Sequence, residues 1–375
     1  MVRALDVSQL QELGYQAGLS AVGVTTADVL SPAAEVLPSR KESGLADRME
    51  FTYRNPGRST SPAQTLPSVK SVITGALNYY QGPRATSKSS HGAEIARYSW
   101  DDYYAELRAG LEPIAEALRS QGGRAQVLAD SNALVDRNAA WRSGLGWYGK
   151  NANLIIPGHG SWVVLGAILT DIALPPTGQP QDDQCGSCTA CIAECPTGAI
   201  VAPGVVDARR CIAWLVQADG EIPIEYRTAV GNRIYGCDEC QEVCPPNRSA
   251  PVTVRSTVKE KDQTADLVWV LSSDDEELLV KYGRWYIAGR DCDVLRRTAL
   301  VAIGNSADPT DVEVVDLLKT YLGHDNPTLR SHAVWAAKRL GLYFLLEIVD
   351  DEPHESVLRE LRATVESRFH KRYSW

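Results

Sequence analysis

Cysteine spacing carries the plainest chemical information in this sequence. Eight of the nine cysteines lie between Cys185 and Cys244, and the ninth, Cys292, lies outside that segment. The first four form a C-x2-C-x2-C-x3-C run that ends at Pro196, which is a ligand spacing of 4Fe-4S clusters. In such a run the first three thiolates bind one cluster and the fourth binds a second. The run consists of Cys185, Cys188, Cys191 and Cys195.

A second, altered half-motif follows. Cys237, Cys240 and Cys244 repeat the x2 and x3 spacing before a proline, and Cys211 is the displaced fourth member. Because the last cysteine of each half binds the cluster of the other half, the predicted ligand sets cross. One set is Cys185, Cys188, Cys191 and Cys244, and the other is Cys195, Cys211, Cys237 and Cys240. Two structural zinc sites are the alternative, although zinc motifs do not usually need this proline-terminated run twice.

The segment GLGWYGK, from Gly144 to Lys150, matches two nucleotide-binding patterns, but its context agrees with neither. A G-x-G-x-x-G loop should follow a strand and begin a helix, whereas this segment follows a helical pattern and precedes strand-like residues. A phosphate loop needs Ser or Thr after its lysine, and Asn151 stands there. We therefore predict a tight turn, whose glycines allow special backbone geometry or close approach of a ligand.

Other residues have weaker claims on their own. Asp130 follows a predicted strand, where a carboxylate can face a ligand crevice, although a helix N-cap or turn aspartate is the simpler explanation. Arg97 and Ser161 lie beside apolar strands without an independent sign of function. Cys292 is expected to be an inert buried thiol. The six histidines show no metal-ligand spacing, so none is assigned as a ligand.

Alternating helices and strands must position these residues. Apolar residues at helical spacing predict helices over 6–19, 103–118 and 134–142. Short apolar runs predict strands over 21–25, 69–79, 125–129, 153–156 and 161–169. We predict the α+β class for the whole chain, with an α/β N-terminal domain.

Three consecutive domains are predicted. Proline and glycine residues between Leu174 and Asp183 mark a boundary, which gives domains over 1–174, 175–253 and 254–375. The second is a bacterial ferredoxin-like domain for two clusters. In the third, LRRTALVAI from Leu295 and LRSHAVWAA from Leu329 begin 34 residues apart. Their matched small and apolar residues predict an all-α domain of HEAT-like repeats.

Composition limits the class of protein further. A length of 375 residues predicts more than one domain. The 38 basic and 47 acidic residues give a net charge of -9, which argues against a protein coated in positive charge but allows a local basic patch. No signal-peptide pattern or long apolar segment occurs, so we expect a cytoplasmic monomer that keeps its thiols reduced and has no membrane partner.

Five segments together resemble the epoxyqueuosine reductase family. They are DSNALVDRNAAWRSGLGWYGKN, GSWVVLGAILTD, CGSCTACIAECPTGAI, VDARRCIAWL and GNRIYGCDECQEVCP. The resemblance is close from Asp130 to Pro245 and looser elsewhere, and the displaced Cys211 is characteristic of that family rather than of ferredoxins at large. It implies an oxidoreductase that uses cobalamin and two 4Fe-4S clusters to reduce epoxyqueuosine to queuosine at the tRNA wobble position. An external low-potential electron donor is implied as well.

The resemblance also implies site residues in the cobalamin-binding N-terminal domain. The family's proton donor maps onto Asp130, and burial beside an apolar corrin could raise its pKa. Cobalamin contacts carried over by position are Arg97, Asp130, Leu154, Ser161 and Leu165. No D-x-H-x-x-G run occurs, so a histidine tail is not expected. After Arg97-Tyr98 the family commonly continues through a glycine to Tyr-His, whereas this chain lacks that glycine and histidine, which leaves local contacts open.

A tRNA partner requires cations for its phosphates, so the net charge of -9 predicts a confined basic strip on the C-terminal domain and near the clusters. The candidates are Arg209, Arg210, Arg233, Lys281, Arg284, Arg290, Arg296 and Arg297. Any one of them could instead belong to a solvated helix face.

Two other functions fit part of the sequence. A corrinoid iron-sulfur reductive dehalogenase-like reductase of a small molecule would pair cobalamin with two such clusters. Those enzymes usually carry a twin-arginine signal, and the Arg-Arg pairs of this chain are internal. A plain electron-transfer ferredoxin module would leave the N-terminal domain unexplained.

Overall fold

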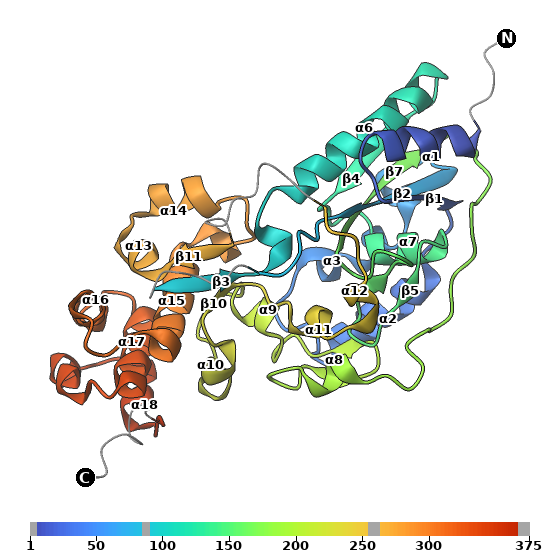
Figure 1. Ribbon diagram of the computed structural model, residues 1–375. Coiled ribbons are helices and arrows are strands. Elements are labelled where there is room, and N and C mark those ends of the chain that lie inside the picture. Colours follow the sequence, from blue (N-terminus) through green and yellow to red (C-terminus); the bar gives the residue numbers. More distant parts are fainter. Residues whose placement is uncertain (1–5, 85–90, 254–262, 367–375) are drawn as a thin grey trace. The chain divides into compact units, whose positions relative to one another are not determined.

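The computed structural model describes residues 6–84, 91–253 and 263–366, and Figure 1 shows its helices and strands. The chain forms two compact units, each built from three stretches of sequence. Unit 1 comprises Met1–Gly82, Asp101–Cys211 and Asp238–Ser256; unit 2 comprises Pro83–Trp100, Ile212–Cys237 and Thr257–Trp375. These units cut across the three predicted domains, because strands from early in the chain pair with later ones in unit 2.

Unit 1 is organised around an antiparallel sheet. The strand order is β1 (Ala21–Thr26), β2 (Ser71–Asn78), β7 (Val163–Thr170) and β4 (Ala125–Ala129). Every neighbouring pair is antiparallel. The mixture of helices and strands agrees with the predicted α+β class, but this sheet is not the mainly parallel sheet that an α/β description of the N-terminal domain implies. The central strands β2 and β7 are buried along almost their whole length, which requires cover on both faces.

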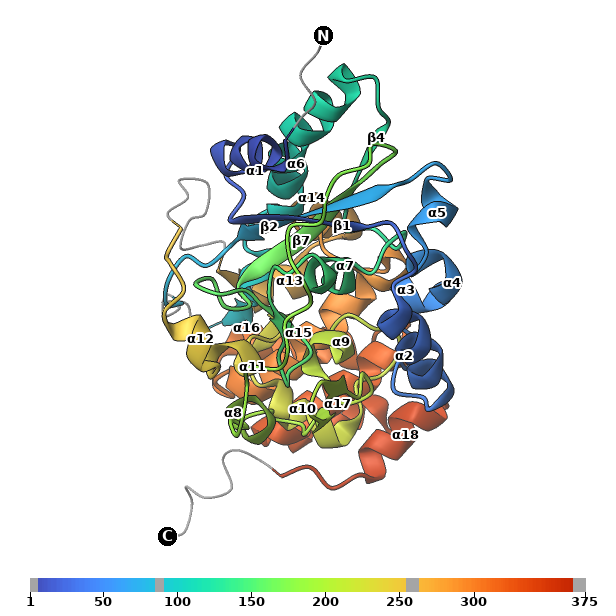
Figure 2. The same cartoon turned by 90° about the vertical axis from the view of Figure 1, so that its right-hand side faces the viewer.

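Helices cover the two faces of this sheet. Helix α6 (Tyr103–Ser120) and helix α1 (Val7–Gln16) lie on one face, and the short helix α7 (Asp136–Arg142) lies on the other, as both views show (Figure 1 and Figure 2). Helix α6 begins where the Asp102 side chain accepts a hydrogen bond from the Ala105 amide, at 2.9 Å. The apolar spacing that predicted it places Leu107, Leu111 and Leu118 in the core.

The remaining elements of unit 1 are short. Residues Trp147–Tyr148 (β5) and Leu154–Ile155 (β6) form a hairpin. The chain therefore reverses at the end of the segment Gly144–Lys150, where a tight turn is predicted, although Trp147 and Tyr148 of that segment lie in β5. The cysteine-rich part has a second hairpin and three single-turn helices. These are β8 (Ile200–Ala202), β9 (Val205–Val206), α8 (Ala190–Ala193), α11 (Glu239–Glu242) and α12 (Pro245–Arg248). The N-terminal part adds α2 (Ser31–Glu42), α3 (Phe51–Arg54), α4 (Pro56–Ser59) and α5 (Pro62–Thr65).

Unit 2 combines helices with a small sheet. Strand β3 (Gly92–Ile95) lies between β10 (Arg233–Tyr235), which is parallel to it, and β11 (Thr264–Asp266), which is antiparallel. The 3-10 turns are Arg97–Ser99, Ala288–Arg290 and Tyr343–Val349. The helices are α9 (Ile212–Leu215), α10 (Ile224–Val230), α13 (Leu267–Ser272), α14 (Asp275–Tyr282), α15 (Asp293–Ser306), α16 (Val312–Leu322), α17 (Pro327–Leu340) and α18 (Glu355–Arg362). Strand β11 shows that the predicted all-α description of the C-terminal part is wrong.

Helices α15 and α17, which carry the two repeated sequences, pack against each other. A Cβ atom at Gly304 would lie only 2.6 Å from the Trp335 ring, so glycine permits this close approach. Leu295 and Leu329, at matching repeat positions, are both buried.

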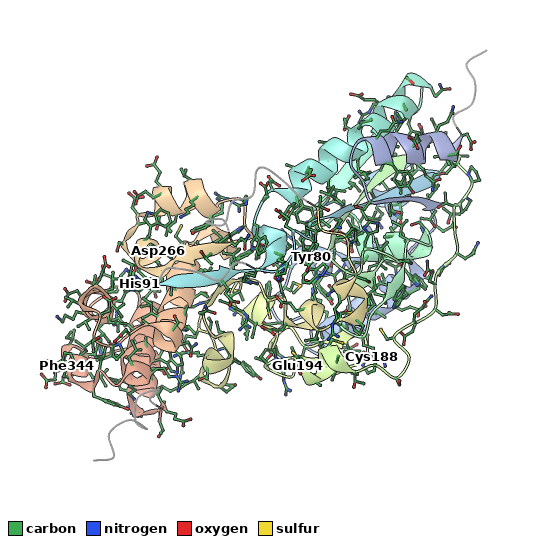
Figure 3. All side chains as sticks on the ribbon, in the orientation of Figure 1. Tyr80, His91, Cys188, Glu194, Asp266 and Phe344 are labelled. Atoms are coloured by element: carbon green, nitrogen blue, oxygen red, sulfur yellow. The ribbon has the colours of Figure 1, made fainter. Side chains whose placement is uncertain are left out.

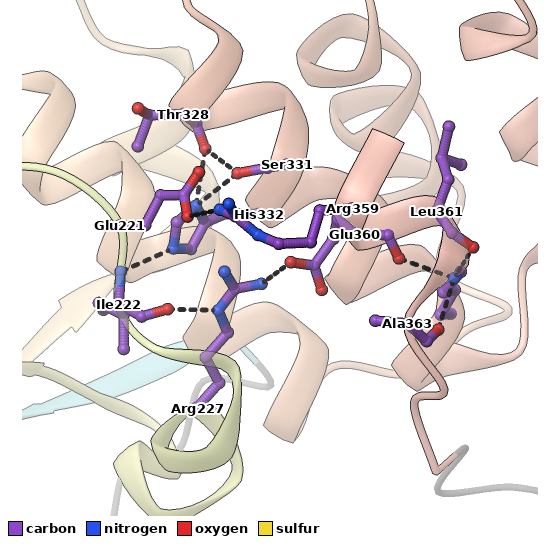
Figure 4. A network of polar contacts seen from close by, with 11 residues as sticks. Glu221, Ile222, Arg227, Thr328, Ser331, His332, Arg359, Glu360, Leu361 and Ala363 are labelled. Carbon is purple, nitrogen blue, oxygen red and sulfur yellow. Dashed lines mark hydrogen bonds and ion pairs between the residues drawn. The ribbon is translucent and has the colours of Figure 1, made fainter. Parts of the chain in front are cut away.

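A buried polar network joins several of these elements within unit 2 (Figure 4). The Arg227 guanidinium lies 3.0 Å from the Glu360 carboxylate, and both side chains are almost fully buried. His332 donates from Nδ1 to the Thr328 carbonyl, at 2.6 Å, and accepts at Nε2 from the Ile222 amide, at 3.2 Å. This assignment of roles requires a neutral ring, because a protonated ring has no acceptor.

No helix among the described residues is long and apolar enough to cross a bilayer.

Candidate active site and cluster sites

One cavity in unit 1 is lined by four cysteines. Its volume is about 270 Å³, and the cysteines are Cys185, Cys188, Cys191 and Cys244, the first predicted ligand set. Cys188 is exposed at the edge of this part of the molecule (Figure 3), whereas Cys244 is buried. Within the described ranges, no three His, Cys, Asp or Glu side chains converge closely enough to hold a single metal ion. Four thiols around so large a space fit a polynuclear cluster better than one zinc ion.

The thiols of this set influence one another electrostatically. Burial, followed by the nearby Cys185, Cys191 and Cys188, raises the pKa of Cys244 to about 11. The pKa of Cys191 is raised by burial and then by Cys185 and Cys188. Four thiolates so close together repel one another unless a cation lies between them, and iron supplies that cation. The donor set therefore fits a 4Fe-4S cluster.

The second predicted set is divided between the units. Cys195, Cys211 and Cys240 belong to unit 1, and Cys237 belongs to unit 2. All four are half-buried, and the Cys195 sulfur accepts a hydrogen bond from the Ala199 amide at 3.2 Å. Their convergence on a second cluster stays a prediction. Cys292 is buried as expected, with its thiol facing the Asp275 carbonyl at 3.7 Å.

Asp130 follows strand β4 directly and has a left-handed backbone conformation, with φ of +51°. Such a conformation is uncommon for residues other than glycine and turns the chain sharply at the end of the strand. The side chain is exposed on one side, yet partial burial raises its pKa, which Arg108 opposes and Asp102 reinforces. An aspartate with a raised pKa retains a proton to a higher pH, which suits a general acid.

Asp136, which the sequence analysis did not single out, lies near Asp130. Both residues line a small cavity of about 10 Å³, which is close to the volume that one water molecule needs. Burial raises the pKa of Asp136, Arg137 opposes this shift, and the charge of Asp130 adds to it. Burial likewise raises the pKa of the neighbouring Tyr148 to about 12. The sequence signal that could have identified Asp136 is its place in the same segment, DSNALVDR, as Asp130.

The other residues predicted to contact cobalamin have buried side chains. Leu154 and Leu165 belong to one apolar cluster of unit 1. Arg97 belongs to unit 2, where it is buried with its guanidinium 5.5 Å from the centre of the Trp100 ring. Of the five predicted positions, Asp130 has the polar side chain open to a ligand.

Ser161 belongs to a buried polar network. Its amide donates to Asn247 Oδ1 at 2.6 Å, and its hydroxyl accepts from Asn247 Nδ2 at 2.9 Å. Gln241 Nε2 also donates to that hydroxyl, at 3.1 Å, and lies at the same distance from the Tyr79 hydroxyl. The network fixes the segments that carry Cys240 and Cys244 beside the start of β7. Sequence reasoning missed Gln241 and Asn247, because amides have no diagnostic spacing.

The predicted tRNA-binding cations differ in how accessible their side chains are, and two of them are largely buried. Arg297 is 1% exposed and donates to the carbonyls of Leu215, Ala218 and Gly220, at 2.8, 2.7 and 2.5 Å. Its prediction as a tRNA contact is wrong, because the side chain satisfies buried carbonyls. Arg296 is neutralised by Asp275 and Asp293, at 2.6 and 3.0 Å, with only 12% of its side chain exposed.

The other predicted cations are more accessible. Arg209 and Arg210 are exposed on either side of the buried Asp207 carboxylate, at 2.8 and 3.7 Å. Arg233 is half-buried and donates to the carbonyls at the end of α10. Lys281, Arg284 and Arg290 are exposed in unit 2. The Lys281 ammonium lies 4.1 Å from the centre of the Trp269 ring, so charge and an aromatic face occur together.

Comparisons with known proteins agree with these arrangements. Residues 184–247 match the model of a 4Fe-4S double cluster binding domain, which includes the eight clustered cysteines. Residues 60–136 match the model described as epoxyqueuosine reductase QueG, DUF1730. The chain therefore contains a two-cluster 4Fe-4S binding domain.

Whole proteins match over most of their length. The epoxyqueuosine reductase of Vibrio cholerae is 36% identical over 88% of this chain and 90% of its own. A crystal structure of epoxyqueuosine reductase with an epoxyqueuosine-modified tRNA-Tyr stem loop is 30% identical, with a TM-score of 0.83 over 94% of this chain and 96% of that chain. A Bacillus subtilis structure, whose catalytic aspartate loop is swung out of the active site, is 30% identical, with a TM-score of 0.82 over the same shares. With this identity over nearly its whole length, the chain belongs to the epoxyqueuosine reductase family.

Proposed function

We propose that this protein reduces epoxyqueuosine to queuosine at the wobble position of tRNA anticodons. The observation that carries the proposal is the match, along almost the entire chain, to a reductase crystallised with an epoxyqueuosine-modified stem loop. Membership of the epoxyqueuosine reductase family favours this reaction over the dehalogenation of a small molecule. The enzyme is accordingly an oxidoreductase.

The reaction needs a source of electrons and a source of protons. Removing the epoxide oxygen as water, which leaves a carbon-carbon double bond, consumes two electrons and two protons. The two-cluster domain can pass electrons one at a time from an external low-potential donor. When bound, cobalamin would supply the reduced cobalt centre at which an electron pair reaches the strained ring.

Asp130 is the proposed proton donor. Its place at the end of β4, its exposure and its raised pKa suit a carboxylic acid that protonates the departing oxygen. The catalytic aspartate loop of the Bacillus subtilis relative supports this role. Arg97, Leu154, Ser161 and Leu165 remain the other proposed cobalamin contacts.

The eight cysteines would hold the clusters in the crossed arrangement. The cavity lined by Cys185, Cys188, Cys191 and Cys244 supports the first set. The second set is Cys195, Cys211, Cys237 and Cys240. We call the site of the first set cluster site 1 and the site of the second set cluster site 2.

The tRNA would contact the accessible cations that remain when Arg296 and Arg297 are set aside. These are the exposed Arg209, Arg210, Lys281, Arg284 and Arg290 and the half-buried Arg233. Helices α15 and α17, with their repeated sequence, would form part of a HEAT-like surface for the anticodon stem. We expect a cytoplasmic monomer.

Nucleoside analysis tests the proposed function. In a strain that lacks the gene, tRNA should accumulate epoxyqueuosine, and complementation should restore queuosine. Protein purified without oxygen should contain iron for two clusters and a corrinoid. Normal queuosine in the deletion strain would contradict the proposal.

A further inference from the structure

The GLGWYGK turn, which binds no nucleotide in our interpretation, lies at cluster site 1. Trp147 and Lys150 from this turn line the same cavity as Cys185, Cys188, Cys191 and Cys244. Trp147 also packs with Ile155 and Cys244 in a small apolar cluster that Cys185 joins. The turn is therefore part of the wall around this site.

Lys150 holds the first cysteine loop through two hydrogen bonds. Its ammonium donates to the carbonyl of Gly186, at 2.6 Å, and to the carbonyl of Cys188, at 2.9 Å. Both carbonyls belong to the loop that joins Cys185 to Cys188. One residue thus fixes the loop between two proposed ligands and places a positive charge beside them.

Trp147 places a buried donor in the wall of the same cavity. Its indole Nε1 is buried and has no hydrogen-bond partner among the described residues. The indole packs in the apolar cluster that contains Cys244 and that Cys185 joins. A buried N–H without an acceptor destabilises the fold, so a sulfur acceptor supplied by a bound cluster explains why this donor is retained.

Glycine makes this arrangement possible. A Cβ atom at Gly146 would lie 2.0 Å from the Ile155 carbonyl oxygen, so strands β5 and β6 can approach closely only with glycine there. The close hairpin presents Trp147 and Lys150 on the side of the cysteines. The close approach of these two strands explains why glycine occurs in a segment whose sequence also matches a phosphate-loop pattern.

We propose that Trp147 and Lys150 are positioning residues that raise the reduction potential of the cluster at cluster site 1; this rests on the proposed function and its first ligand set. Reduction adds negative charge to a cluster and its thiolates. Hydrogen bonds to the sulfurs and a nearby cation stabilise that charge, and both are established determinants of cluster potentials. The buried indole N–H lies in the wall of the cavity, where a cluster sulfur would accept it, and the ammonium acts on the loop that carries Cys188.

Redox titration of the anaerobically purified holoenzyme, monitored by electron paramagnetic resonance, tests this proposal. Trp147→Phe keeps most of the packing and removes the indole donor, and Lys150→Met removes the ammonium. Each should shift one cluster to a lower midpoint potential and leave the other unchanged. Lys70→Met, at an exposed lysine of unit 1, is the matched control and should shift neither cluster.

Iron analysis separates loss of the cluster from a change in its potential. If Lys150→Met loses iron, Lys150→Arg should recover both iron and potential, which supports a positioning role. Full iron with unchanged potentials in both Trp147→Phe and Lys150→Met would overturn the proposal. These readouts need no tRNA, so a wild-type protein that fails to reduce epoxyqueuosine would refute the proposed function alone.

Discussion

Asp130 and Asp136 line one small cavity at the end of β4, and the charge of Asp130 raises the pKa of Asp136. Burial is the larger cause of that shift, and Arg137 opposes it. Because the interaction is repulsive when both groups are ionised, the pair favours a state that retains one proton. Burial and this repulsion therefore extend to higher pH the range in which one of the two carboxyl groups keeps a proton.

The pair predicts how stability depends on pH. The pKa of Asp136 is raised in the folded state, so its contribution to stability is complete below the ordinary value of 3.8 and is lost as pH rises through the folded value. Asp136→Asn should therefore stabilise the protein relative to wild type at pH 7 but not at pH 3.5. Thermal unfolding at both pH values measures this, with the exposed Asp182→Asn as control. An equal difference at both pH values would contradict the assignment.

Asp130→Asn should abolish most turnover, because the amide cannot protonate the departing oxygen. General acids contribute about 10²–10⁴-fold to rates, and a loss in that range is expected. Single-turnover assays on a modified stem loop measure the effect. Iron content and stem-loop affinity should stay at wild-type levels; full activity in the Asp130→Asn variant would exclude the proton-donor role.

Cys211→Ser should disturb cluster site 2 only. The crossed ligand assignment places Cys211 with Cys195, Cys237 and Cys240, so the signal from cluster site 1 should persist while total iron falls. Iron analysis with electron paramagnetic resonance distinguishes these outcomes. Cys292→Ala, at the buried thiol outside the cysteine segment, is the control and should keep all the iron. Two complete clusters in Cys211→Ser would refute the ligand assignment.

Lys281→Ala should weaken tRNA binding through the loss of one phosphate contact. The ammonium is exposed beside Trp269, so its removal should lower stem-loop affinity and reduce the salt slope by about one. Fluorescence anisotropy over a range of salt concentrations measures both quantities. Lys319→Ala provides the comparison, since that lysine pairs with Asp316 at 2.9 Å. Equal slopes in the two variants would remove Lys281 from the proposed surface.

The buried His332 of unit 2 leads to a second prediction about how stability depends on pH. Burial lowers its pKa well below 6.5, and Arg227 and Arg297 add to the shift. The stability that the neutral ring contributes is present above 6.5 and is lost as pH falls toward the folded value. His332→Asn should therefore flatten the pH dependence of unfolding between about pH 6.5 and 5. The exposed His354→Asn is the control, because asparagine can also cap α18.

Local patterns in the sequence predicted local structure well. The apolar spacing of Leu107, Leu111 and Leu118 was sufficient for α6, and the run before Asp130 was sufficient for β4. Strand pairing was not predictable in the same way, because antiparallel and parallel partners leave similar short apolar runs. Strand β3 has only four residues, and its pairing depends on partners far along the chain.

In the candidate site too, features set by nearby residues in the sequence were predictable, and features set by tertiary contacts were not. Cysteine spacing predicted a ligand set that lines one cavity, because cluster ligands are close in sequence as well as in space. The charge of Arg297 indicated a surface, but its guanidinium instead satisfies three carbonyls in the core, and only tertiary structure reveals that burial. Trp147 and Asn247 were missed because their importance depends on neighbours brought together by folding.

The pairing of β3 affects how the protein is made. Glu94 of β3 pairs with Arg233 on one side and with Thr264 on the other, so its last partner is synthesised long after it. At about 5–20 residues per second, a ribosome needs roughly 10–30 seconds to reach that partner. Until Arg233 is synthesised both edges of β3 lack their native partners, and from then until Thr264 one edge still does; such edges can pair with other chains. Unit 2 therefore completes its sheet only late in translation, which makes the nascent chain a candidate for chaperone protection.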